Sequence, residues 1–289
     1  MADTSSKTSL TLDGLGAETL TLPQGTQVAD MAILRSGQDL ILRDDGQEIV
    51  VENYFLAEPQ PDLLSDSGSR LSPDLVQSFV IHDGPVMMAS PLTMSDVSPV
   101  GEITELEGAG TITRTDGTIE SLSLGMPVFE GDILETAENG AANITFIDES
   151  SFAISDNARM AIDEFVFDPS SESGVTDVSL LKGVFLFTSG LIGRENPDAV
   201  EIETPVGSIG IRGTIIGGDI KPSGEESQIS VIEGAIVVRN ATGESILSEQ
   251  FETVRVNDFN ATIQEIGVLD AQDIAGDYGA VKGVSASLF

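Results

Sequence analysis

An alternation of apolar and polar residues, broken repeatedly by Gly, Asp and Asn, limits the fold of this chain more than any other feature. Residues 9–12 and 19–22 alternate in this way, and so do residues 101–108 and 109–114. Alternation with a period of two places the apolar side chains on one face of a β-strand. Strand-sized runs recur about every ten residues and long amphipathic helical patterns are absent, so the sequence predicts an all-β protein.

Residues 39–55 have the pattern of a β-hairpin. The runs 39–43 and 48–51 are separated by Asp45-Gly46, and Asp-Gly between two such runs favours a tight hairpin turn. With Asn53-Tyr54-Phe55, this segment resembles the N-terminal prefix module of large secreted bacterial adhesins of the Bap type. We therefore expect a small N-terminal β-hairpin module over residues 1–58, either of that type or an ordinary β-module.

The amino-acid composition changes between residues 59 and 97, where Pro, Ser, Asp and Met dominate. Ser72-Pro73 has the form of a helix start, with Ser72 as the cap and Pro73 at the first position. We interpret residues 59–97 as a linker with a small docking segment. The β pattern then returns over residues 98–260, and residues 261–289 form a C-terminal tail. The tail is either an uncleaved secretion signal of the type I kind or a final strand with a loose or weakly helical end.

The charge balance excludes several classes of partner. Only 13 Lys and Arg stand against 48 Asp and Glu, for a formal net charge of −35. Phosphate backbones and anionic membrane surfaces repel such a protein, so we expect no nucleic-acid binding. A hydrophobic content of 40% argues against disorder. We find no run typical of a signal peptide or a membrane-spanning helix, so we expect no membrane insertion and export without a cleaved leader.

The residue types needed for common enzyme chemistry are scarce. There is one histidine, His82, and no cysteine, which leaves no material for a His-based triad or a His/Cys metal centre. No phosphate-binding glycine loop lies between a strand and a helix. We therefore predict a non-enzymatic protein without a cofactor. The acidic pairs Asp148-Glu149 and Asp163-Glu164 either form a solvated face or bind calcium weakly.

The most specific motif begins at Thr204-Pro205 and ends at Arg212-Gly213-Thr214. It places an arginine among apolar residues and glycines in a chain that has few cations. Because burying an unpaired charge is unfavourable, we predict that Arg212 pairs with a carboxylate such as Asp132 or Asp148 and ties distant strands together. The alternative is that Arg212 faces a partner protein.

Six ordered elements, which include this motif, are similar to the FecR-type domain, named from the iron-citrate signalling protein of Gram-negative bacteria. They lie within residues 101–114, 125–136, 144–148, 180–185, 204–214 and 231–238. The chain departs from the common Asp-Gly-Ser turn, because it has Asp148-Glu149-Ser150. Gly131-Asp132 is interpreted as a tight turn, with a ligand role for Asp132 as the alternative. The motif residues that the resemblance marks as structural are Gly131, Asp132, Asp148, Thr204, Pro205, Arg212, Gly213, Thr214 and Gly234.

The resemblance carries expectations about fold and function. We expect short strands in a solenoid-like arrangement or a two-sheet stack, and the ten-residue rhythm favours coiling. Residues 157–169 resemble the version of the domain found near the N-termini of very large surface proteins. That implies a non-catalytic module for surface display, adhesion or biofilm assembly, exported by a leaderless type I-like route to the cell surface or beyond, with protein partners in the cell envelope.

The alternative function belongs to signalling. FecR-type proteins relay a receptor signal to a sigma factor, so the chain is alternatively a sensing or regulatory component that acts through protein contacts. The location would then be the periplasm or the cytoplasm. The sequence does not specify the oligomeric state.

Overall fold

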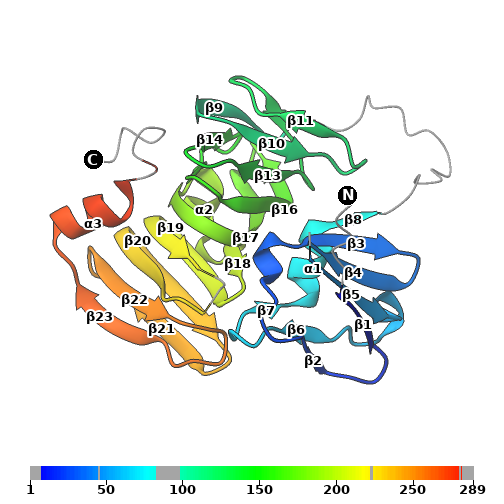
Figure 1. The fold of residues 1–289 in the computed structure, drawn as a ribbon. Helices are drawn as coiled ribbons and strands as arrows, with labels where there is room; N and C mark the ends of the chain where they lie inside the picture. Colours follow the sequence, from blue (N-terminus) through cyan, green and yellow to red (C-terminus); the bar gives the residue numbers. More distant parts are fainter. Residues whose placement is uncertain (1–7, 45, 83–97, 222–223, 280, 282–289) are drawn as a thin grey trace.

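A computed structural model of the chain describes residues 8–44, 46–82, 98–221, 224–279 and 281 (Figure 1). It confirms the predicted all-β class, because the described strands form three hydrogen-bonded sheets with only short helices between them. Within the described ranges, no helix is long and apolar enough to cross a lipid bilayer. We call residues 8–82 the N-terminal unit and residues 98–281 the large domain.

The N-terminal unit contains two small sheets and one α-helix. The five-stranded sheet has the order β1 (Thr8–Asp13), β5 (Gln47–Glu52), β4 (Asp39–Arg43), β3 (Ala32–Ser36) and β8 (Val80–His82). The second sheet has the order β2 (Thr19–Thr21), β6 (Asp62–Leu64) and β7 (Arg70–Leu71), and the helical segments are η1 (Val28–Asp30), η2 (Tyr54–Leu56) and α1 (Pro73–Phe79). The hairpin expected from residues 39–55 is present as antiparallel β4 and β5, although Asp45 lies outside the described residues.

The segment interpreted as a linker is largely part of the N-terminal unit. Residues 62–82 form β6, β7, α1 and β8, and the helix begins as expected, since the Leu75 amide donates to Ser72 Oγ at 3.0 Å. Apolar side chains from this stretch are fully buried in the core of the unit, namely Leu63, Leu71, Leu75, Val76 and Phe79. The stretch that its composition predicted to be a linker is therefore partly packed into a core. Residues 83–97 lie outside the described part.

The large domain is a stack of two β layers. Its strands are β9 (Gly101–Glu107), β10 (Gly110–Thr113), β11 (Ile119–Ser121), β12 (Pro127–Val128), β13 (Ile133–Thr136), β14 (Ala141–Phe146), β15 (Ser151–Ile154), β16 (Arg159–Asp168), β17 (Ser173–Thr188), β18 (Val200–Thr204), β19 (Gly207–Ile220), β20 (Ser227–Asn240), β21 (Gly243–Leu247), β22 (Glu252–Val256) and β23 (Gln264–Val268). Its helical segments are α2 (Leu191–Glu195), η3 (Pro197–Ala199) and α3 (Ala271–Asp277). β23 and α3 belong to the segment expected as a tail, so the sheet continues beyond residue 260.

Three long strands pass from one layer into the other, which links the layers into one hydrogen-bonded sheet. In the first layer, which also contains β10, β11, β13 and β21, the first part of β17 pairs with β16 and β18. In the second layer, which also contains β9, β12, β14, β22 and β23, the last part of β17 pairs with β15 and β19. β19 and β20 change neighbours in the same way, at a register shift between Arg212 and Ile215. The arrangement is thus the two-sheet stack of the two architectures expected, and its core lies between the layers, where Phe152 stacks on Phe185 with ring centroids 5.4 Å apart.

The bend shared by β19 and β20 requires glycine. Gly213 has a φ of +58° and Gly234 has a φ of +89°, a conformation that L-residues adopt rarely. A Cβ on Gly234 would also lie 2.7 Å from the carbonyl oxygen of Gly213. The Arg-Gly-Thr element therefore marks the point at which both strands turn into the second layer.

A shared cluster of buried side chains joins the two units. The buried cluster of the N-terminal unit includes Ile133 of β13, Ala161 of β16 and Leu181 of β17 from the large domain. These side chains lie on the outer face of the first layer, which the N-terminal unit covers (Figure 1). On the outer face of the second layer, α3 buries Ile274 and Tyr278.

Candidate functional site

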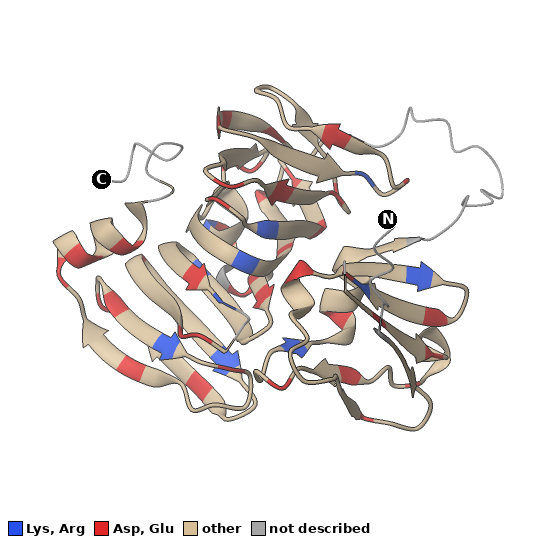
Figure 2. Cartoon of the chain, in the orientation of Figure 1, with Lys and Arg blue, Asp and Glu red and all other residues tan. Residues whose placement is uncertain are grey.

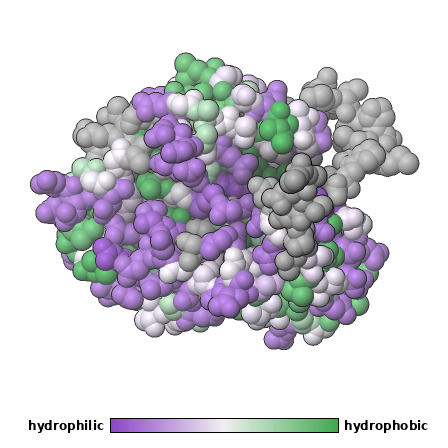
Figure 3. Space-filling view, in the orientation of Figure 1, coloured by the Kyte–Doolittle hydropathy of each residue, from purple (hydrophilic) through white to green (hydrophobic). Residues whose placement is uncertain are grey.

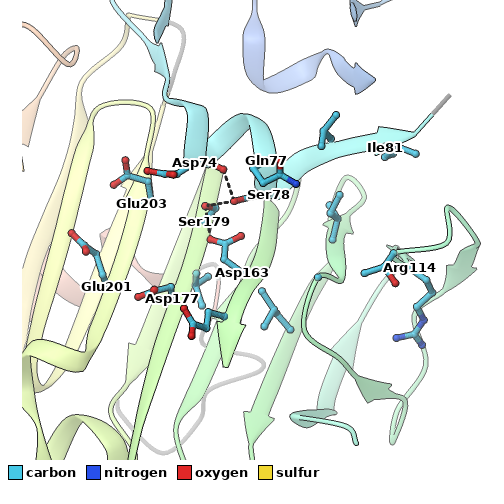
Figure 4. A pocket seen from close by; sticks show the side chains of 17 residues that line it. Asp74, Gln77, Ser78, Ile81, Arg114, Asp163, Asp177, Ser179, Glu201 and Glu203 are labelled. Carbon is cyan, nitrogen blue, oxygen red and sulfur yellow. Dashed lines mark hydrogen bonds between the residues drawn. The ribbon is translucent and has the colours of Figure 1, made fainter. Parts of the chain in front are cut away.

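A cavity of about 720 Å³ lies where α1 and β8 of the N-terminal unit meet β16, β17 and β18 of the large domain (Figure 4). Six carboxylates line it: Asp74, Asp163, Glu164, Asp177, Glu201 and Glu203. The one basic residue of the described lining is Arg114, on the opposite side from Glu201 and Glu203. Arg114 is already paired with Asp132 at 2.6 Å and with Glu120 at 3.0 Å, so the acidic wall has no free cation to balance it within the described lining.

The register of three strands places the carboxylates side by side. Glu164 of β16 is paired with Asp177 of β17, which is paired in turn with Glu201 of β18. A register shift between Ile162 and Glu164 makes Asp163 an extra, bulged residue, and a bulge re-aims its side chain. Like charges directly opposite one another destabilise a sheet. Repulsion among these three paired carboxylates therefore destabilises the sheet at this point.

A short hydrogen-bonded chain joins α1 to the acidic wall. Ser179 Oγ lies 2.6 Å from Asp163 Oδ2 and 3.2 Å from Ser78 Oγ, and Ser78 Oγ donates to the Asp74 carbonyl at 2.8 Å (Figure 4). The other carboxylate oxygen, Asp163 Oδ1, is buried without a hydrogen-bond partner among the described residues. A buried carboxylate with a hydrogen bond to only one of its two oxygens is energetically unfavourable when it is ionised.

Burial raises the pKa of three of these carboxyl groups. It raises the pKa of Asp163 to about 6, against the hydrogen bond from Ser179, which favours the charged form. Burial, with the charges of Glu201 and Glu164, raises the pKa of Asp177 to about 6.

Glu203 has the highest of the three values. Burial raises its pKa to about 7, although the charge of Arg70 opposes the shift. The cavity wall therefore titrates close to neutral pH, which carboxyl groups in water do not do.

Arg159 ties the two units together beside this cavity. Its guanidinium donates to the Met31 carbonyl at 2.7 Å, pairs with Glu135 at 3.0 Å and lies 5.2 Å from the ring centroid of Phe79. Only 6% of Arg159 is exposed. It is thus a buried arginine that links distant elements, the role that the sequence had suggested for Arg212.

The pairing predicted for Arg212 is wrong. The Arg212 side chain is 50% exposed, and its ion-pair partner is Asp198, at 3.5 Å and itself 81% exposed. Asp132 and Asp148, the two expected partners, are occupied elsewhere. Arg212 precedes the bend glycine Gly213 on an outward-facing part of β19, so it needs no buried counter-charge.

The two motif aspartates hold turns. Gly131 has a φ of +83°, and Asp132 Oδ2 accepts from the Phe129 amide at 2.7 Å, while burial raises the pKa of Asp132. Asp148 Oδ1 accepts from the amide and hydroxyl of Ser150 at 3.0 and 2.5 Å. Glu149, between Asp148 and Ser150, has a φ of +70°. It therefore occupies the position that glycine fills in the Asp-Gly-Ser form of this turn.

The remaining motif residues lie at two structural contacts. Thr204 Oγ1 donates to the Gly207 carbonyl at 2.5 Å, and the Pro205 carbonyl accepts from the Arg70 amide of the N-terminal unit at 2.9 Å. The Thr214 amide donates to Ser189 Oγ at 3.0 Å, beside the bend at Gly213 and Gly234. Motif residues therefore lie at four places in the large domain, and none of them except Gly131 lines the cavity.

Sequence reasoning named the pair Asp163-Glu164 but missed the site. Within the described ranges no group of three or more His, Cys, Asp or Glu is arranged to hold a metal ion. His82, assigned to the linker, is the last residue of β8. One sequence feature could have indicated that Arg159 is buried: it lies between Ala158 and Met160, in an apolar setting like that of Arg212.

The family model described as FecR protein matches residues 132–237. The large domain therefore contains a FecR domain, which runs from β13 into β20 and includes the acidic wall and the bend at Gly213. No curated protein matches the chain.

Among solved structures, two crystal structures of a candidate anti-sigma factor from Parabacteroides distasonis ATCC 8503 are similar to part of the chain. They are 17% and 16% identical, with TM-scores of 0.41 and 0.40, and each match covers 50% of this chain and 62% of the other. A cell surface anchoring domain is 31% identical over 22% of this chain and 82% of its own, with a TM-score of 0.21. The chain thus spans less than two thirds of the anti-sigma proteins, and TM-scores of this size do not establish a shared overall fold.

Proposed function

We propose that the protein is a sensing or regulatory component of a FecR-type cell-surface signalling pathway and that it acts through protein contacts. The observation that carries this proposal is the FecR domain over residues 132–237. Its motif residues Asp132 and Asp148 hold turns, and the Thr214 amide donates to Ser189 Oγ. We propose that the domain is a scaffold that presents surfaces to partners, without catalytic activity and without a cofactor.

The charge of the protein defines the kind of partner. Acidic residues are spread over both units (Figure 2), and hydrophilic residues cover most of the face drawn in Figure 3, with apolar residues in small separate groups. With a net charge of −35, association is fastest with a partner that presents a basic surface. We propose protein partners of the cell envelope with such a surface, and a location in the periplasm or at the cell surface.

Surface display, adhesion or biofilm assembly is the second candidate function. It is favoured by the β4–β5 hairpin, which is present in the segment that resembles the adhesin prefix module. Export by a type I-like route remains part of this proposal, with the tail over residues 261–289 as its candidate signal. Of these, residues 280 and 282–289 lie outside the described part of the chain.

Deletion of the gene in the native organism separates the two candidates. Under the signalling proposal, transcripts that depend on one alternative sigma factor change, and the gene supplied in trans restores them. Unchanged transcripts together with lost attachment or biofilm would support the second candidate instead. Fractionation with antibody detection tests the location, and protein found only in the cytoplasm would contradict both proposals of location.

A further inference from the structure

The outer side of β1 (Thr8–Asp13) is an open edge of the five-stranded sheet in the N-terminal unit. β1 pairs in parallel with β5 over its whole length without a register shift, and no described strand lies on its other side (Figure 1). Its side chains at Ser9, Leu10, Thr11 and Asp13 are exposed. An edge of this kind offers unpaired backbone N–H and C=O groups to an added strand.

The other edge strands that the structure describes are less suited to pairing. β2, β7, β8, β11 and β12 have at most three residues each. β21 and β23 have five, but β21 carries Glu244, β23 carries Glu265, and the pairing of β23 with β22 has a register shift. Short length, charged side chains and bulges all discourage edge-to-edge pairing. β1, in contrast, has six residues, an unbroken register and no charged side chain over residues 9–12.

We propose that the β1 edge is a docking surface for a second copy of this chain. A two-fold axis between the copies pairs the two β1 strands antiparallel and joins two five-stranded sheets into one. The contact belongs to the N-terminal unit, so it does not depend on the function proposed for the FecR domain.

Charge selects a second copy as the occupant of this edge. Each copy carries a formal net charge of −35, so most pairs of surfaces from two copies repel each other. Like charges that face one another across a ladder destabilise it, and residues 9–12 bring no carboxylate into the shared ladder. A partner with a basic surface, by contrast, is attracted to the acidic surfaces and gains no electrostatic attraction from this uncharged edge.

Apolar side chains beside the strand add surface that the second copy covers. Leu10 is 37% exposed, and Leu15, which follows the strand closely, is 52% exposed. A Cβ on Gly14 would lie 3.0 Å from Tyr54 Cα, which places η2 and its exposed Leu56 next to the end of β1. Figure 3 shows apolar residues gathered on the N-terminal unit, where Figure 1 draws β1. Because one strand from each copy makes most of the contact, the dimer is expected to be weak.

Sedimentation equilibrium of the whole chain tests whether a second copy binds. We expect a monomer–dimer equilibrium whose Kd falls at least about tenfold between about 50 and 500 mM NaCl, because salt screens the repulsion between two acidic copies. Association that weakens with salt would mean attraction between opposite charges and would contradict the proposal. A monomer at both salt concentrations, up to about 0.5 mM protein, would contradict it too.

A single spin label shows where the two copies meet. The sequence has no cysteine, so Ser9→Cys gives one label on β1 of each copy. Paired strands lie about 5 Å apart, so the two labels of a dimer should be closer than about 25 Å. The control label is Ile246→Cys on β21, an exposed position, and it should give no such short distance. A short distance at Ile246 and not at Ser9 would place the contact at the wrong edge and end the proposal.

Charged variants test the strand itself. Leu10→Glu puts a carboxylate on β1 of both copies, so the Kd at 500 mM NaCl should rise at least about tenfold. Ile246→Glu is the matched control, since it adds the same charge at an exposed apolar position of another edge strand and should dimerise like the parent. Circular dichroism checks that both variants keep the fold. Equal dimerisation of Leu10→Glu and the parent would overturn the proposal.

Ser9→Glu keeps the test decisive if Leu10→Glu does not fold. Ser9 is exposed and lies on the other face of β1 from Leu10, so this variant adds the charge without removing an apolar side chain. The same rise in Kd is expected. An unchanged Kd in Ser9→Glu would count against the β1 edge as decisively as an unchanged Kd in Leu10→Glu.

Discussion

Replacement of Arg159 by alanine should destabilise the protein far more than the same replacement of Arg212. Arg159 is 6% exposed and donates to the Met31 carbonyl at 2.7 Å. Without the guanidinium, that carbonyl loses its donor, at about 1–3 kcal/mol for a buried group. The contact with the Phe79 ring adds about 0.5–2 kcal/mol.

The ion pair of Arg159 contributes less than a fully buried pair would. Glu135 is 45% exposed, so it returns to water when its partner is removed, and the loss is about 1 kcal/mol or less. Taken together, the free energy of unfolding should fall by about 3 kcal/mol, which corresponds to a melting temperature lower by roughly 8 °C for a domain of this size. For Arg212→Ala, with two half-exposed or exposed partners, the fall should stay within about 0.5 kcal/mol.

Urea and thermal unfolding, followed by circular dichroism, measure both variants under the same conditions. The far-ultraviolet spectrum of each variant should match the parent, which shows that the comparison concerns stability and not a different fold. A fall in Arg212→Ala as large as in Arg159→Ala would refute this reasoning, because it would mean that an exposed pair outweighs a buried one. A fall of less than 0.5 kcal/mol in Arg159→Ala would refute it equally.

Three further changes test other parts of the structure. A Cβ at Gly218 would lie 2.2 Å from the Phe185 ring, so Gly218→Ala should lower the free energy of unfolding by about 1–3 kcal/mol. Gly276 on α3 has open space around its Cβ position, so Gly276→Ala should leave the free energy of unfolding equal or raise it by up to about 1 kcal/mol. Because the pKa of Asp163 is raised to about 6, its penalty is present above pH 6 and fades as pH falls toward 4; Asp163→Asn should therefore stabilise the protein by about 1–3 kcal/mol at pH 8 and have little effect at pH 4. Tyr278→Phe removes a 2.7 Å hydrogen bond but keeps the ring, so a loss of about 1 kcal/mol is expected in urea unfolding, and a loss above 3 kcal/mol would contradict this account of α3.

The fold class and several local features were accessible from the sequence because they depend on neighbours along the chain. The alternation predicted strands, Asp-Gly predicted a hairpin, and Ser72-Pro73 predicted the start of α1. Residues 62–82 were missed as part of a core because their serines and their position within a proline-rich stretch resemble a linker, while the burial of Leu63 and Phe79 depends on strands far away in the sequence.

The candidate site could not be derived in the same way. Whether Arg159 or Arg212 is buried depends on which face of a strand meets the N-terminal unit, and local composition is alike at both positions. The acidic wall arises from the register that pairs Glu164 with Asp177 and Asp177 with Glu201. A shift of one residue would turn these side chains to the other face, and nothing in the composition of an acidic chain distinguishes the two registers.

The buried cluster shared by the two units has a practical consequence for anyone who divides this protein. A fragment that starts at residue 98 would uncover Ile133, Ala161 and Leu181, which now lie beneath the N-terminal unit. Apolar surface that becomes exposed in this way promotes aggregation. Dimers or aggregates formed by such a fragment would therefore report the cut itself, and biochemical work on the FecR domain should retain everything from residue 8 onward.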